Sequence, residues 1–170
     1  MIEVEITDEM LRLAWAKSID MGKIKKSITE GDGNIAGFLG ELVANKVLGG
    51  TIQNTMDYDI VLDDGTTIDV KTKRCTSAPM PYYECSVAAY NTVQKCDKYA
   101  FVRVEYVKTK YTRAWFLGTI DKHKYFEKSR KLYKGQKDGT NWFIVKSDCY
   151  NLKIEDLDEN RTDENCSKQE

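Results

Sequence analysis

Residues 57–74, DYDIVLDDGTTIDVKTKR, hold five aspartates and end in a cluster of basic side chains. Alternating apolar residues on both sides of Asp63-Asp64-Gly65 predict a β-hairpin with strands over residues 58–62 and 66–72. A three-residue loop that ends in glycine suits a type I turn followed by a left-handed residue. This register predicts four cross-strand pairs: Leu62 with Thr66, Val61 with Thr67, Ile60 with Ile68, and Asp59 with Asp69.

The aspartate pair of this register presents an electrostatic problem. Two carboxylates that face each other directly across a ladder repel, and side-chain alternation places Lys71 on the same face as Asp59 and Asp69. The opposite face is apolar and is expected to meet the core (Ile60, Leu62, Ile68 and Val70). A divalent metal would supply the missing counter-charge. In the plain alternative, Asp57 lies opposite Lys71 and a cross-strand salt bridge uses up the lysine.

The length and composition of the chain indicate a globular protein. It has 170 residues, of which 41% are hydrophobic and 31% charged. We expect one domain over residues 1–157, followed by an acidic tail over residues 158–170. No apolar run approaches the length of a membrane span, and the acidic start is unlike a signal peptide. We therefore expect a cytoplasmic protein without a membrane partner, in the host cytoplasm if the source is viral.

The cysteines, the histidine and the glycines argue against several kinds of site. Five cysteines without regular spacing fit free thiols better than a disulfide framework, and Cys85 and Cys96 are expected to be buried. Because no Cys-x-x-Cys pair occurs, a zinc knuckle is not expected. His123, the only histidine, reads as a surface residue, which leaves a histidine-dependent triad without support. No glycine-rich phosphate loop precedes a helix, so we expect no nucleotide cofactor.

The net charge of −1 hides an uneven distribution. Residues 108–137 carry ten Lys or Arg against two acids, with aromatic residues interleaved, whereas residues 155–170 carry seven acids against two basic residues. A basic, aromatic-rich section can follow a phosphate backbone. Its plain alternative is a solvated helix face and loop.

The rest of the chain predicts an α/β domain. A first helix is expected over residues 7–19, with Thr7 as N-cap and an apolar side made of Met10, Leu11, Leu13 and Ala14. After a polar link (residues 22–33), a second helix is expected from Asn34 to about Val47, closed by Gly49-Gly50. Further strands are predicted over residues 82–88, 98–107, 112–120 and 141–146, and further helices over residues 89–97 and 121–133. This order predicts a central mixed β-sheet flanked by α-helices.

Three motifs occur in order: Gly40-Glu41 in an early helix, Asp59 at the opening of a hairpin, and Asp69-Val70-Lys71 on the returning strand. Together they resemble the PD-(D/E)XK nuclease superfamily over residues 34–120, which implies a restriction-endonuclease-like core. Two positions depart from the name of the motif, since Tyr58 replaces proline before the aspartate and Asp69 stands where glutamate is frequent. Both are variants that the superfamily uses.

The resemblance implies a catalytic set of Glu41, Asp59, Asp69 and Lys71. It also implies Mg²⁺, replaceable by Mn²⁺, held by the three carboxylates and the main-chain carbonyl of Val70. The chemistry agrees, because hard oxygen ligands select Mg²⁺ and phosphodiester hydrolysis needs an activated water and a cation near the phosphate. Lys71 would orient the attacking water and help to deprotonate it. Taken singly, Glu41 would be an ordinary surface glutamate, and Asp-x-Lys occurs by chance in many strands.

The expected function is a Mg²⁺-dependent deoxyribonuclease, an endonuclease of junction-resolvase-like or phage type, with a restriction endonuclease as a further alternative. Lys73 would hold a phosphate oxygen, and Arg74, Lys122 and Lys124 would help to bind the DNA. The resemblance allows a homodimer, because two strands must be cut, but the residues give no independent sign of one. The other hypotheses are an inactive nucleic-acid-binding module that keeps the fold and a metal-binding regulatory domain.

Overall fold

The computed structural model describes residues 1–21, 34–53, 55–138 and 143–158, and the polar link predicted over residues 22–33 lies outside them. Its largest feature is a six-stranded mixed sheet with the strand order β1-β7-β6-β4-β3-β2. Neighbouring strands are antiparallel except β4 and β6, which are parallel. The strands are β1 Ile2–Glu5, β2 Thr51–Ile52, β3 Ile60–Val61, β4 Thr67–Cys75, β6 Lys98–Val107 and β7 Lys110–Asp121.

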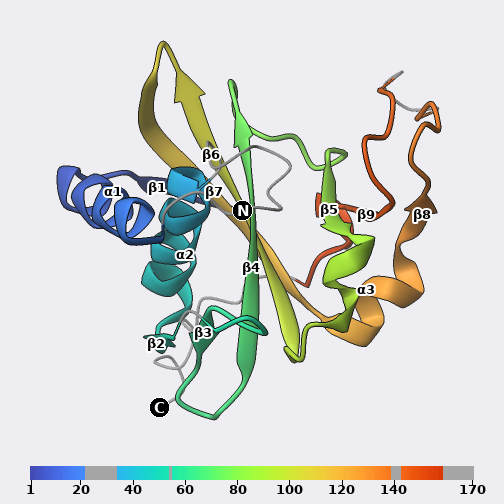
Figure 1. The fold of residues 1–170 in the computed structure, drawn as a ribbon, viewed down its shortest axis with the longest axis horizontal. Coiled ribbons are helices and arrows are strands. Elements are labelled where there is room, and N and C mark those ends of the chain that lie inside the picture. Colours follow the sequence, from blue (N-terminus) through green and yellow to red (C-terminus); the bar gives the residue numbers. More distant parts are fainter. Residues whose placement is uncertain (22–33, 54, 139–142, 159–170) are drawn as a thin grey trace, which may run out of the picture.

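A second, three-stranded antiparallel sheet has the order β5-β9-β8, with bounds β5 Glu84–Ala88, β8 Arg130–Leu132 and β9 Cys149–Lys153. The helices α1 Asp8–Met21 and α2 Asn34–Leu48 lie on one side of the large sheet, and the second sheet and α3 Lys122–Lys128 lie on the other (Figure 1). Two short 3-10 helices, η1 Ala89–Val93 and η2 Ile154–Asp156, complete the described elements. The predicted central mixed sheet with flanking helices is confirmed.

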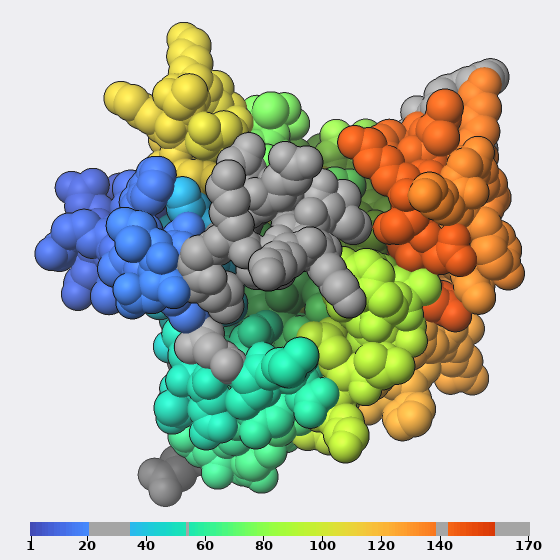
Figure 2. Space-filling model, in the orientation of Figure 1, coloured from blue at the N-terminus to red at the C-terminus, as the bar shows by residue number. Residues whose placement is uncertain are grey.

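Each face of the large sheet has its own core. On the α1 and α2 side, buried residues from both helices pack on the sheet, among them Phe38, Leu39, Val43, Ile68, Val102 and Phe116. On the other side, the core joins the large sheet to β5, β9 and α3 through Val87, Tyr99, Phe101, Leu117, Tyr125 and Leu152. Figure 2 shows the consequence for the shape: α1 (blue) and the strands β8 and β9 (orange to red) stand at opposite sides, and the β6–β7 hairpin (yellow) projects from the upper edge.

The two long helices follow their predicted signals. The N–H of Met10 donates to Thr7 Oγ1 at 3.2 Å, which confirms the N-cap of α1. The helix α2 ends as predicted at glycines in the left-handed region, with φ of 76° at Gly49 and 79° at Gly50. The assignment of Leu13 to the apolar side was wrong, because its side chain is 52% exposed. None of the helices in the described ranges is both long and apolar enough to cross a membrane.

Several elements differ from the sequence-based expectation, and of the helix predicted over residues 89–97 only the 3-10 helix η1, Ala89–Val93, is present. The helix predicted over residues 121–133 begins as expected at Asp121, whose carboxylate accepts from the N–H groups of His123 and Lys124, but it stops at Lys128. The chain then becomes extended, and β8 pairs with β9. The late strand was predicted over residues 141–146, of which 141 and 142 lie outside the described residues; Ile144 forms only an isolated bridge with Lys137, and the regular strand that follows is β9. The strands β1, which pairs antiparallel with β7, and β2, which pairs antiparallel with β3, were not predicted.

The hairpin confirms most of the predicted register. Ile60 pairs with Ile68 and Val61 pairs with Thr67, and the turn closes with the N–H of Leu62 donating to the carbonyl of Thr66 at 2.9 Å. Gly65 has a φ of 85°, as the turn type requires. The register was wrong at Asp59: its N–H donates to the carbonyl of Ile68 at 2.9 Å, so β3 begins only at Ile60 and Asp59 does not face Asp69 in the ladder.

Candidate active site at the free edge of strand β4

Strand β4 pairs with β6 along almost its whole length on one edge, whereas its other edge has a partner strand only at its start. It pairs with β6 from Ile68 to Cys75, but it pairs with β3 only at Thr67 and Ile68. Two residues beyond Ile68, the N–H of Val70 donates to Asp59 Oδ2 at 2.7 Å. The carboxylate of Asp59 thus takes the place of a strand partner, and this hydrogen bond draws it to the edge of β4.

Helix α2 brings Glu41 to the same edge by a close helix–strand contact. A β-carbon built on Gly40 would lie only 1.8 Å from Thr72 Oγ1, so only glycine fits here without movement. The next residue, Glu41, is 9% exposed and is linked electrostatically to Asp69 and Asp59. The Gly-Glu dipeptide therefore has a physical reason: the glycine allows the approach, and the approach delivers the carboxylate.

Glu41 has a cationic partner from α1. Lys17 Nζ lies 2.7 Å from Glu41 Oε2 and 4.5 Å from the centre of the Phe38 ring. Burial raises the pKa of Glu41 above its ordinary value, and the hydrogen bond and charge of Lys17 oppose that rise. Lys17 therefore compensates part of the buried negative charge.

Asp69 and Lys71 form the centre of the site. They are joined by an ion pair, and the side chains of Asp69 and Lys71 are only 5% and 16% exposed. Gln94, just after η1, bridges the two: its Nε2 donates to Asp69 Oδ1 at 3.2 Å, and its Oε1 accepts from Lys71 Nζ at 3.0 Å. The ring of Tyr99 lies beneath the ammonium group, with its centre 5.8 Å from Lys71 Nζ. Each polar group of the pair is thus held in a fixed orientation.

The carboxylates repel one another even though the ladder does not place two of them face to face. The pKa of Asp59 is raised from 3.8 to about 7, first by burial, then by the charge of Asp69 and next by that of Glu41. The hydrogen bond from Val70 and the charge of Lys71 oppose this rise without cancelling it. The raised pKa therefore reflects burial first and the charges of the two neighbouring carboxylates second. Asp57, the alternative partner of Lys71, instead accepts from the N–H of Lys95 at 3.1 Å.

The side chains present suit a hard divalent cation, although they are not gathered around one. Among the described residues, no group of three or more His, Cys, Asp or Glu side chains already surrounds a common point. Glu41, Asp59 and Asp69 nevertheless interact electrostatically, and the buried Asp69 Oδ2 has Lys71 Nζ as its ion-pair partner. Carboxylate oxygens are the donors that Mg²⁺ and Mn²⁺ prefer. The donor set fits such an ion, with Lys17 and Lys71 as the present sources of positive charge.

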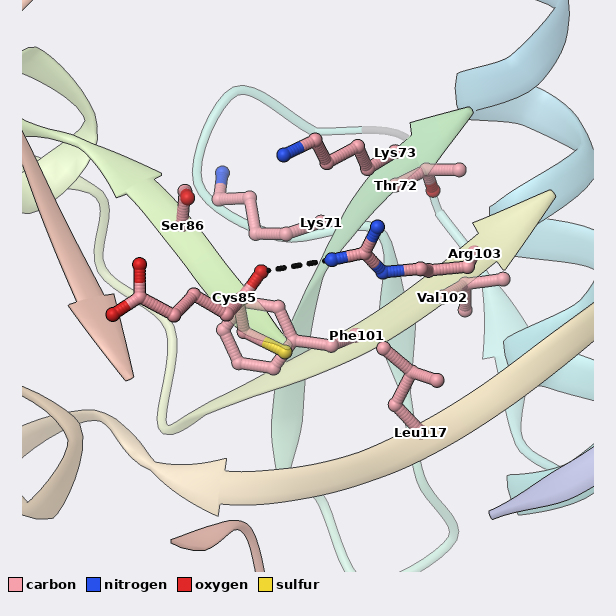
Figure 3. A pocket seen from close by; sticks show the side chains of 10 residues that line it. Lys71, Thr72, Lys73, Cys85, Ser86, Phe101, Val102, Arg103 and Leu117 are labelled. Carbon is pink, nitrogen blue, oxygen red and sulfur yellow. Dashed lines mark hydrogen bonds between the residues drawn. The ribbon is translucent and has the colours of Figure 1, made fainter. Parts of the chain in front are cut away.

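The four predicted nucleic-acid-binding residues do not lie in equivalent places. Lys73 projects from the same side of β4 as Lys71 into a pocket between the two sheets (Figure 3). Arg74 is exposed, with its guanidinium 5.3 Å from the centre of the Tyr106 ring. Lys122 donates to the carbonyl of Gln94 and so supports the residue that bridges Asp69 and Lys71. Lys124 forms an ion pair with Asp158.

Sequence reasoning did not find three residues of this region. Lys17 and Gln94 hold the charged groups of the site, and Arg103 lines the adjacent pocket. The sequence gives no signal for Gln94, which contacts Asp69 from a chain separation of 25 residues. Arg103 had a signal, since a cation in the middle of the apolar strand KYAFVRVEYV is unusual in a buried sheet.

His123 is exposed, and Cys85 and Cys96 are buried, as predicted. A scan against protein-family models finds no match for the chain, and a search of curated proteins finds no similar sequence. The site is therefore argued from its own geometry.

Proposed function

We propose that the chain is a Mg²⁺-dependent nuclease that hydrolyses phosphodiester bonds of DNA, with Glu41, Asp59 and Asp69 as metal ligands and Lys71 as the catalytic lysine. One observation carries the proposal: the residues of three separate sequence motifs meet at the free edge of β4. Their convergence joins a helix, the end of β3 and the middle of β4. The resemblance to the PD-(D/E)XK superfamily over the same residues supports it.

The roles of the side chains follow from their surroundings. Asp59 and Asp69 would bind the metal through their carboxylates, with Glu41 binding directly or through water, and the carbonyl of Val70 is a proposed further ligand. Mg²⁺, when bound, lowers the pKa of a water molecule and offsets the charge of the phosphate. Lys71 Nζ would donate hydrogen bonds to the attacking water and the reacting phosphate, and its charge stabilises the negative charge that develops there. Gln94 would keep Lys71 and Asp69 in orientation.

The test is a cleavage assay with Mg²⁺ or Mn²⁺ on linear duplex, single-stranded and four-way-junction DNA. Wild type, Asp69→Asn and Lys71→Met are compared, and EDTA gives the metal-free control. Asp63→Asn is the matched control, because Asp63 is an exposed residue of the same hairpin turn. We expect metal-dependent cleavage that is kept by Asp63→Asn and lost by the two site variants.

The contrary outcomes separate the alternatives. If wild type binds DNA but cuts none of the three substrates, the inactive binding module replaces the nuclease. If wild type neither binds nor cuts, a metal-binding regulatory domain is the remaining hypothesis. The preferred substrate decides between a junction-resolvase-like enzyme and a nuclease for linear DNA. Cross-linking of the active protein tests the proposed homodimer.

A further inference from the structure

Two cations lie side by side on the face of the sheet that carries Lys71. In the parallel ladder of β4 and β6, Lys73 is the partner of Arg103, and Lys71 is the partner of Phe101. Like charges at paired positions of a sheet repel and are unfavourable unless an anion lies between them. Lys71, Lys73 and Arg103 all line one pocket of about 180 Å³ between β4, β6 and β5 (Figure 3).

Arg103 is buried but only partly hydrogen-bonded. The residue is 8% exposed. Its Nη2 donates to the carbonyl of Glu84 at 3.0 Å, and its guanidinium lies 5.4 Å from the centre of the Tyr83 ring. A guanidinium carries five N–H donors, and no nitrogen of Arg103 is among the buried unpartnered atoms of the described residues, so its other donors reach solvent. In the described residues, that carbonyl is its one hydrogen-bond acceptor. Arg103 therefore presents unused donors inside the pocket.

The nearby acid, Glu84, offsets the two charges of Lys73 and Arg103 only in part. Glu84 lines the pocket, but its carboxylate accepts from Arg130 Nη2 at 2.9 Å and from Asn151 Nδ2 at 2.9 Å, and Arg130 also binds Asp138. Lys73 is an exposed residue and forms no ion pair or hydrogen bond with the described residues; partial desolvation at the pocket, followed by the charge of Arg103, lowers its pKa. The pocket keeps an excess of positive charge beside the candidate catalytic lysine.

We propose that Lys73 and Arg103 form an anion site that binds the phosphate next to the scissile one on the same nucleic-acid strand. The inference rests on the proposed function and adds Arg103 and a defined substrate position to it. Lys71 and Lys73 are two residues apart on one strand, hence about 7 Å, which is comparable with the distance between successive phosphates. The pocket is smaller than the roughly 300–1,000 Å³ of sites for whole small molecules, so it suits a single phosphate group.

The first experiment measures binding without cleavage. Fluorescence anisotropy in EDTA gives the Kd of wild type, Lys73→Gln and Lys46→Gln for a 20-nucleotide DNA strand at several salt concentrations. Lys46 is an exposed lysine on α2, across the sheet from the pocket, and is the matched control. We expect Lys73→Gln to lower the slope of log K against log salt by about 0.7–0.9, the value for one phosphate contact, and Lys46→Gln to leave it unchanged. Equal slopes for both variants overturn the site. Arg103→Lys, which keeps the charge but fewer donors, is a second variant.

The second experiment places the phosphate. Once the scissile bond of an oligonucleotide is known, the neighbouring phosphate on each side is replaced in turn by a neutral methylphosphonate. We expect one replacement to slow wild type by about tenfold or more, as for the loss of a charge-assisted hydrogen bond, and to slow Lys73→Gln no further. If Lys73→Gln loses as much as wild type, the contact lies elsewhere and the proposal fails. If wild type cuts nothing, the nuclease proposal fails instead, and the salt slopes alone decide the anion site.

Discussion

Gly40 of α2 lies so close to Thr72 of β4 that a β-carbon on the glycine would stand 1.8 Å from the hydroxyl oxygen and 2.8 Å from the β-carbon of the threonine. No side chain fits into that space without moving the helix away from the strand. Because Glu41 follows Gly40 directly, the same contact fixes the helix position that delivers this carboxylate. The fold and the candidate site therefore depend on one point of contact.

We expect Gly40→Ala to destabilise the protein by about 1–3 kcal/mol or more, the cost of overpacking a close contact. Thr72→Gly should remove the obstructing atoms, so that Gly40→Ala costs less in that background than in wild type. Urea unfolding of the four proteins measures this coupling. Gly37→Ala is the control in the same helix: its β-carbon would meet no atom within 4 Å, and we expect it to stabilise by about 0.5–1 kcal/mol. Equal effects of the two alanines would contradict the role of the contact.

Local chemistry explains which parts of the fold were predictable. The turn residues and the alternation fix the pairing of Ile60 with Ile68, and caps fix the ends of α2. The strands β8 and β9 depend instead on pairing with each other and with β5, which is far away in the sequence. Within the run predicted as a late strand, residues 143–145 do pair with residues 135–138, but only over a short stretch that leaves Phe143 and Ile144 exposed. Apolar character alone does not decide how long a paired segment becomes.

The candidate site, like the fold, was predictable only in part. The motif residues were visible in the sequence, because their types and order carry the chemistry. Their supports were not, since Lys17 reaches Glu41, and Gln94 reaches Asp69, only through the packing of separate elements. The Asp59 register failed for a related reason. The sequence showed a ladder, but it did not show that the carboxylate would bind the N–H of Val70.

The pKa of Asp59, raised from 3.8 to about 7, predicts a pH-dependent stability of the metal-free protein. Between these values the folded state holds a proton that the unfolded state releases, so the free energy of unfolding falls as the pH rises, by at most about 1.4 kcal/mol per pH unit. The stabilisation is complete below about pH 4 and is lost as the pH passes about 7. Asp59→Asn should lack this loss and be more stable than wild type at pH 8.

Thermal unfolding in EDTA at pH 5, 6, 7 and 8 measures this difference, with Asp63→Asn as the control that keeps the wild-type slope. Under the proposed function, a metal competes with the proton, so excess Mg²⁺ should raise the Tm of wild type more at pH 8 than at pH 6. Parallel profiles of Asp59→Asn and wild type would contradict the assignment to Asp59.

Gln94 gives a prediction about positioning rather than chemistry. Its amide orients both Asp69 and Lys71, and loss of such a support around a metal site costs about 10–100-fold in metal affinity or activity. We therefore expect Gln94→Ala to raise the Mg²⁺ concentration needed for half-maximal cleavage, with a smaller change at saturating metal. Gln53→Ala, at an exposed glutamine, is the control. A fall in cleavage that Mg²⁺ does not offset would assign Gln94 a direct role in the reaction.

The ion pair of Asp69 and Lys71 tests charge compensation without any cleavage assay. Both side chains are largely buried, so Lys71→Met leaves an uncompensated carboxylate, and we expect it to destabilise the metal-free protein by about 3–5 kcal/mol. Asp69→Asn/Lys71→Met removes both charges and should recover most of that loss. Urea unfolding at pH 8 measures the cycle. The exposed pair Lys153–Glu155 is the control, and Lys153→Met should leave the unfolding midpoint unchanged.

Excess Mg²⁺ should then stabilise Lys71→Met more than wild type, because the metal replaces the missing positive charge. If Mg²⁺ stabilises neither protein, the three carboxylates are a structural cluster and the metal site is wrong.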